Sequence, residues 1–162
     1  MSLSREIVAT YRGPGAVMRR LLAQGPREDR ALMFIMAACA LFFVAQLPAQ
    51  ARQAHLDGVD PNPLMGGALL GWLVLAPLLF YGLAALSHLI ARVFGGRGTG
   101  YGARLALFWS LLAASPLLLL NGLVAGFMGP GPQLMLVGLL WFVIFLWFWL
   151  RSLTVAEREG QA

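Results

Sequence analysis

Among the few polar side chains inside the long apolar stretches of this chain, four are candidates to form hydrogen bonds or move protons: Tyr81, His88, Ser110 and Asn121. Tyr81 and His88 are seven residues apart and share one face of a helix, and Ser110 and Asn121 share a face of the next helix. Because histidine changes charge near neutral pH, His88 is the titratable member of a predicted polar site between these helices. The alternative is that the four groups only satisfy one another across a helix interface, since neither a second metal ligand nor an acid accompanies His88.

The sequence offers no second constellation for catalysis. Every charged residue lies at an end of the four apolar stretches or outside them, which excludes the intramembrane carboxylate relays of proton pumps. Cys39 is the single cysteine, so it forms no intrachain disulfide and is expected to pack as a small apolar residue. We therefore expect a protein that is not an enzyme, with no catalytic residue, no cofactor and no metal site.

A glycine-rich segment, Gly95 to Gly102, invites a phosphate-binding interpretation. The P-loop pattern requires a lysine, which this chain lacks, and no strand is predicted to hold a dinucleotide-binding turn. We therefore expect a flexible connection whose arginines contact lipid phosphates, or Glu28 and Asp29. The residues predicted to contact lipid headgroups or a partner are Arg19, Arg20, Arg92, Arg97 and Arg104.

Four long apolar stretches must position these residues. The chain of 162 residues is 59% hydrophobic with a mean hydropathy of +0.74, outside the range of soluble domains. Because a transmembrane helix needs about 20 apolar residues, an all-α, polytopic membrane protein is predicted, a bundle of four transmembrane helices. The predicted parts are an amphipathic arm at 1–25, a transmembrane domain at 26–156 with approximate spans 26–47, 64–94, 105–127 and 134–150, and a tail at 157–162.

Prolines predict the ends and distortions of these helices. The first helix is expected to start at Pro26 and to end before Pro48, with a polar outer loop from there to Pro63. The second stretch would be roughly 45 Å long against a hydrocarbon core of about 30 Å, so a helix that tilts or bends at Pro77 is predicted. The third helix is expected to kink at Pro116.

The arginines predict the orientation in the membrane. Eleven of the twelve lie at or before the start of the first stretch, around the junction of the second and third, or after the fourth, and only Arg52 lies on the other side. Because basic loops stay in the cytoplasm, both termini are predicted to be cytoplasmic. The net charge of +5 is therefore expected to attract anionic lipid headgroups and not nucleic acid. Arginine without lysine hints at a GC-rich bacterium, and hence at a bacterial inner membrane.

The arm at 1–25 carries apolar residues at helical spacing around a Gly13-Pro14-Gly15 break, with Arg19 and Arg20 on the opposite face. This pattern is typical of a helix that lies in the membrane interface. A cytoplasmic helix that packs on the bundle fits the same pattern, and the two alternatives stay open.

Small and aromatic residues predict helix contacts. Two GxxxG motifs are expected to bring the second and third helices together, or in one case to serve self-association; their glycines are Gly67, Gly71, Gly122 and Gly126. An aromatic ridge on the fourth helix is predicted to contact lipid or to dock another membrane protein; it consists of Trp141, Phe145 and Trp149.

The segment from His88 to Leu120 resembles the core of the Yip1 family. In that family a helix ends in a Gly-Gly-basic-Gly loop, here Gly95-Gly96-Arg97-Gly98, and the next helix carries small residues before a proline, here Ala113-Ala114-Ser115-Pro116. The region from Tyr11 to Arg30 is similar to short bacterial members. The resemblance implies a helical integral membrane protein, commonly drawn with five spans, without established catalytic residues. Eukaryotic relatives are associated with small GTPases through longer cytosolic segments, which this chain lacks, so that association is not carried over.

Three functions from different classes follow. The leading hypothesis is a non-enzymatic inner-membrane protein that acts by binding, as scaffold, assembly factor or accessory subunit of a membrane complex. The second is a small oligomeric transporter or channel with its polar site between helices two and three. The third is lipid handling or bilayer shaping through the arginine-rich arm. The expected partners are membrane lipids and either another membrane protein or a second copy of the chain.

Overall fold

The computed structural model describes residues 2–159, and nearly all of this part is helical. Its elements are α1 Leu3–Arg12, α2 Pro14–Ala23, α3 Glu28–Asp57, α4 Asn62–Leu70, the π-helical turn η1 Gly71–Leu75, α5 Ala76–Val93, α6 Gly100–Phe127 and α7 Pro132–Glu159. The segments α4, η1 and α5 follow one another without a break and make one long helix. Four helices are long and apolar enough to cross a membrane, which confirms the predicted all-α, polytopic fold.

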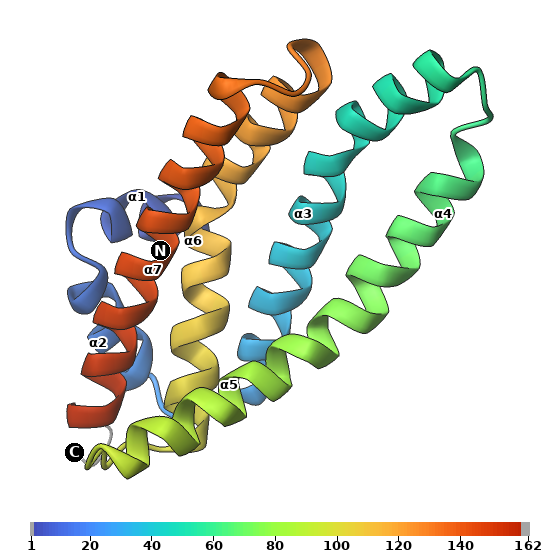
Figure 1. Ribbon diagram of the computed structural model, residues 1–162. Helices are drawn as coiled ribbons and strands as arrows, with labels where there is room; N and C mark the ends of the chain where they lie inside the picture. Colours follow the sequence, from blue (N-terminus) through green and yellow to red (C-terminus); the bar gives the residue numbers. More distant parts are fainter. Residues whose placement is uncertain (1, 160–162) are drawn as a thin grey trace.

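The third of these four helices, α6, forms the centre of the bundle. It lies between α3 and α7, and α5 crosses its lower end (Figure 1). In the most apolar part of α6, 56% of the residues are buried, against 11% in the second and fourth helices. Trp109 and Phe108, both on α6, are among the largest fully buried side chains of residues 2–159. The second and fourth helices therefore provide most of the apolar outer surface.

The first long helix passes through Pro48 and ends only at Asp57, so the predicted loop from Pro48 onward was wrong over these ten residues. An interior proline removes one helical hydrogen bond, a loss that packing on a neighbouring helix can outweigh. Here Pro48 lies against Gly126 of α6. One turn later, Arg52 donates to the Gly126 carbonyl at 3.4 Å. Gly58, with a φ of 65°, then ends the helix.

The other two prolines inside long helices are accommodated in different ways. Just before Pro77 the chain widens into the π-helical turn, where Ala76 N–H bonds to Gly71 O, so the distortion lies one turn earlier than predicted. At Pro116 the helix continues, and the Ser115 hydroxyl donates to Leu112 O at 2.7 Å. That carbonyl is the one that Pro116, without an N–H, leaves free.

The amino-terminal arm packs on the bundle, as one of the two alternatives for it predicted. The indole N–H of Trp109 donates to Thr10 Oγ1 at 3.0 Å, and both residues are fully buried. The Tyr11 hydroxyl donates to Ala113 O at 3.0 Å, and its ring meets the edge of Phe148 at 4.9 Å. Burial raises the pKa of the Tyr11 phenol, which therefore remains a hydrogen-bond donor.

The contact between arm and core yields a first prediction. Replacing Thr10 with valine keeps the shape of the side chain but leaves the buried indole N–H of Trp109 without an acceptor. We expect a loss of about 1–2 kcal/mol in unfolding free energy and faster trypsin cleavage after Arg12 and Arg20. Ser4→Ala, at an exposed position of the same helix, is the control. Equal cleavage rates in both variants would show that this bond does not hold the arm.

Candidate functional site

The glycine-rich segment between α5 and α6 is ordered at both ends, contrary to the predicted flexible connection. Gly95, with a φ of 87°, turns the chain at the end of α5, and Gly96 N–H bonds back to Ala91 O at 2.8 Å. At the other end Thr99 caps α6 by accepting a hydrogen bond from Gly102 N–H at 3.1 Å. The residues between these two caps are held by a third helix.

That third helix is α7, through Glu157 in its last turn. Its Oε2 accepts from Gly98 N–H at 3.0 Å, and its Oε1 lies 3.0 Å from Nδ1 of His88 on α5. The carbonyl of Glu157 accepts from Arg97 N–H at 3.1 Å. The Glu157 side chain is only 8% exposed. We call His88, Arg97, Gly98 and Glu157 the Glu157 clasp, because one residue joins two helices and the loop.

Two glycines of this segment, Gly96 and Gly98, are required by the close approach of Glu157 on α7. A Cβ on Gly98 would lie 2.8 Å from Glu157 Cα, and a Cβ on Gly96 would lie 2.6 Å from Glu157 Oε2. Both distances are shorter than a side chain tolerates, so only glycine lets the loop reach the helix. The glycines therefore serve packing, and Arg92 and Arg97 remain exposed at this end of the bundle.

The acid partner of His88 is a residue that sequence reasoning missed. His88 was expected to lack an acid, but Glu157 stands 69 residues further along the chain and had been placed in the tail. The only signal in the sequence is that the end of the second helix and the end of the fourth lie on the same predicted side of the membrane. That signal predicts that His88 and Glu157 lie on the same side of the membrane, but it does not predict that they touch.

The four residues of the predicted polar site do not bond to one another. Tyr81 packs its ring on the edge of Phe108 at 4.8 Å. Ser110 is buried and donates to Ala106 O at 2.6 Å within its own helix. Asn121 lies further along α6 and lines a separate cavity. Only His88 keeps a polar partner outside its own helix, and that partner is Glu157.

The two GxxxG motifs differ in what they contact. Gly122 and Gly126 pack against α3, where a Cβ on either would overlap the backbone of Ala45 or Pro48. Gly67 and Gly71 have nothing within 4 Å of the place where a Cβ would stand. The predicted contact between helices two and three through these motifs was therefore wrong, because the first helix takes the place of the second.

The aromatic ridge on α7 turns toward the bundle. The Trp141 and Phe145 rings stack at 5.6 Å, and Phe145 and Trp149 at 5.7 Å. Phe145 is only 8% exposed, so its predicted role in contact with lipid was wrong. Trp141 lies near Phe42 of α3, with ring centroids 6.2 Å apart.

Arginines tie the start of α3 to its neighbours. Arg104 on α6 pairs with Glu28, its Nε lying 3.3 Å from Oε2, as one of the two sequence alternatives predicted. Arg30 donates to Leu21 O at 3.0 Å, at the end of α2. Arg20 pairs with Glu6 of α1 at 3.3 Å. The bond of Arg30 to Leu21 O holds the end of α2 beside α3, and the pair of Arg20 with Glu6 joins α2 to α1 within the arm.

The fold thus defines a multi-pass helical membrane protein whose glycine loop is fastened to its last helix. The family model of the Yip1 domain matches residues 8–162, and the chain belongs to the Yip1 family. The match extends from the arm through the clasp and confirms the resemblance that the glycine loop and the Ala-Ala-Ser-Pro segment indicated. No significant match was found among curated proteins or among solved structures.

Proposed function

We propose that this protein acts by binding, as a scaffold or accessory subunit that docks a transmembrane helix of another membrane protein on α4. The observation that carries this proposal is the open pair Gly67 and Gly71 on one of the two least buried long helices. Glycine in a helix costs about 1 kcal/mol relative to alanine, and small residues at this spacing let a second helix approach closely. The other glycine pair of the chain is used in that way, against α3.

The surroundings of this pair favour an apolar partner within the bilayer. Between Asn62 and Leu75 no residue is charged, and Leu70, Val74 and Leu75 are exposed by more than half of their surface. A soluble partner would gain nothing from such a face in lipid, whereas a transmembrane helix with small residues of its own would fit the glycines. The clasp supports this role because it anchors the far end of the same long helix to α7.

The arginine asymmetry supports a location in the cytoplasmic membrane of a bacterium, with both termini and the clasp on the cytoplasmic side. Arg92 and Arg97, exposed beside the clasp, are then placed to contact anionic headgroups.

Copurification from mild detergent tests the docking of a partner. We expect the wild-type chain to elute in a stoichiometric hetero-complex, and Gly67→Leu or Gly71→Leu to reduce the partner at least about tenfold, since a leucine keeps the helices apart. Gly66→Leu, next to the motif but on another face and equally open, is the matched control. Loss of the partner in all three variants, or in none, would contradict the proposal. A homo-oligomer that conducts ions in liposomes would instead support the transporter alternative.

A further inference from the structure

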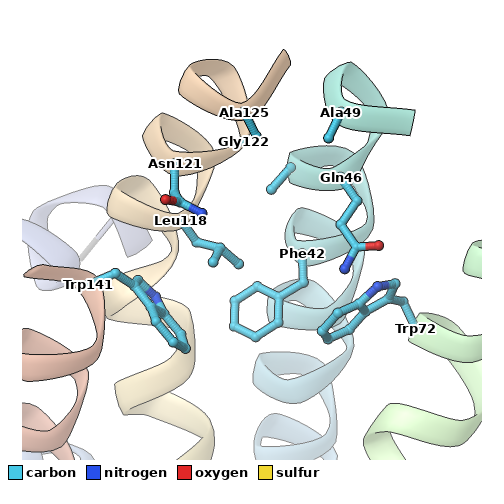
Figure 2. Close-up of a pocket in the computed structure, with 10 residues that line it drawn as sticks. Phe42, Gln46, Ala49, Trp72, Leu118, Asn121, Gly122, Ala125 and Trp141 are labelled. Atoms are coloured by element: carbon cyan, nitrogen blue, oxygen red, sulfur yellow. The ribbon is translucent and has the colours of Figure 1, made fainter. Parts of the chain in front are cut away.

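A cavity of about 340 Å³ lies near the hairpin end of the bundle, which is the end where α3 joins α4 and α6 joins α7. Its walls come from α3, η1, α6 and α7 (Figure 2). The volume is in the range of small-molecule sites, which are mostly apolar with a few polar groups. Neither the Glu157 clasp nor the open glycines of α4 contribute to it, so it is independent of the function proposed above.

The deep part of the cavity is aromatic. Phe42 stands between two tryptophans, with its ring 5.3 Å from Trp72 and 6.2 Å from Trp141. Trp72 belongs to the π-helical turn, whose extra residue changes the direction of the side chains that follow. Such turns are frequent at functional sites. Here the turn brings a large ring to the wall of the cavity, where it fits an apolar chain.

Two buried polar atoms of residues that line the same cavity have no partner within residues 2–159. Asn121 Oδ1 and Trp141 Nε1 are buried and have no hydrogen-bond partner among the described residues. Leaving such a group unpaired costs about 1–3 kcal/mol. Figure 2 shows the amide nitrogen of Asn121 on the side of the cavity, and Gln46 lies across from it. An ester carbonyl accepts hydrogen bonds, so it would satisfy the Trp141 indole N–H and could also accept from an amide NH₂ group. Asn121 Oδ1, itself an acceptor, gains no partner from it.

Arg52 lies above the cavity and is the only arginine of the hairpin end. It follows Ala49, a lining residue, by one helical turn, and it donates to Gly126 O at 3.4 Å. Along α3, from the interior outward, the side chains are therefore the aromatic ring of Phe42, the amide of Gln46 and the guanidinium group of Arg52. From Phe42 to Arg52 the helix rises about 15 Å at 1.5 Å per residue. Half of a bilayer with its headgroups is about 20 Å, so this order matches the acyl chain, ester and phosphate of one phospholipid.

We propose that this cavity binds a single phospholipid with an anionic headgroup. One acyl chain occupies the space between Phe42, Trp72 and Trp141. The ester region meets the amides of Gln46 and Asn121 and the indole N–H of Trp141. The phosphate pairs with Arg52, whose bond to the Gly126 carbonyl is long at 3.4 Å and is exchanged for a charged partner.

Photocrosslinking in vesicles tests the acyl-chain part of the proposal. The purified full chain is reconstituted with phosphatidylglycerol that carries a diazirine on one acyl chain, irradiated, and digested for mass spectrometry. We expect adducts concentrated on the peptides that contain Phe42, Trp72 and Trp141. Ala125→Phe fills the cavity and should lower these adducts at least about tenfold. Ala40→Phe, at an exposed position of α3, should leave them unchanged.

Adducts spread over the exposed faces of α5 and α7 in the wild type, or equal labelling in Ala125→Phe, would overturn the proposal. If Ala125→Phe does not elute as the wild type does in gel filtration, Ala49→Leu, with a smaller side chain in the same cavity, takes its place. Whichever variant is used, the positions of the adducts on the wild-type chain show whether the acyl chain lies in the cavity.

Arg52→Gln tests the headgroup. We expect the wild type to prefer labelled phosphatidylglycerol over labelled phosphatidylcholine about tenfold, and the variant to label both equally and about as strongly as the wild type labels phosphatidylcholine. Arg158→Gln, exposed at the other end of the bundle, is the control. If a free diazirine fatty acid labels the cavity as well as the phospholipid does, and Arg52→Gln changes nothing, the ligand is a fatty acid and the phospholipid assignment is wrong.

Discussion

Replacement of Gly122 with leucine is expected to separate α3 from α6 and to lower the free energy of unfolding by at least about 3 kcal/mol. A Cβ at this position would overlap the backbone carbonyl of Ala45, which cannot turn away as a side chain can. Four residues later Gly126 meets Pro48 in the same way, so the two helices cannot slide past the obstruction. The measurement is reversible unfolding in mixed micelles, followed by circular dichroism.

Gly67→Leu serves as the control for this prediction, because nothing lies within 4 Å of the place where its Cβ would stand. Since leucine is a better helix former than glycine, the isolated chain should be as stable as the wild type or slightly more stable. Equal destabilisation by both substitutions would mean that leucine is harmful at any glycine of these helices, and that the contact between α3 and α6 is not the cause.

The second large effect is expected from Glu157→Ala, with a loss of about 3 kcal/mol in unfolding free energy. The substitution leaves the Gly98 N–H and His88 Nδ1 without their acceptor, in a place where the carboxylate is only 8% exposed. Because the same residue holds the glycine loop, hydrogen exchange of the amides from 95 to 100 should become faster by at least about tenfold. Mass spectrometry of exchanged peptides in detergent measures this change.

Arg158→Ala, the exposed neighbour of Glu157, is the control and should change neither stability nor exchange. A double-mutant cycle with His88→Ala separates the histidine from the loop. We expect a coupling energy of about 1–2 kcal/mol between His88 and Glu157. Additive effects would show that the 3.0 Å contact contributes no net free energy and that Glu157 acts through Gly98 alone.

Much of the architecture could be predicted from the sequence, because each apolar stretch is by itself long and hydrophobic enough to form a transmembrane helix. The four long helices, the all-α class and the family followed from runs such as 105–127 and from the glycine loop. The contact between Glu28 and Arg104 was also foreseen as one alternative, since both lie on the arginine-rich side. The helix that crosses Pro48 was not foreseen, because its cost is offset only by a neighbour from another part of the chain.

The sequence by itself determined the four long apolar helices and the clustering of most arginines near one end of them. These properties depend on hydrophobicity and backbone geometry, which are local. Only the tertiary structure decided which helices touch: Gly122 meets Ala45 and not Gly67, His88 meets Glu157 and not Ser110, and the ridge at Trp141 turns inward. The physical reason is that an apolar helix has several nearly equivalent faces, and the choice among them is set by the fit of side chains far apart in the sequence.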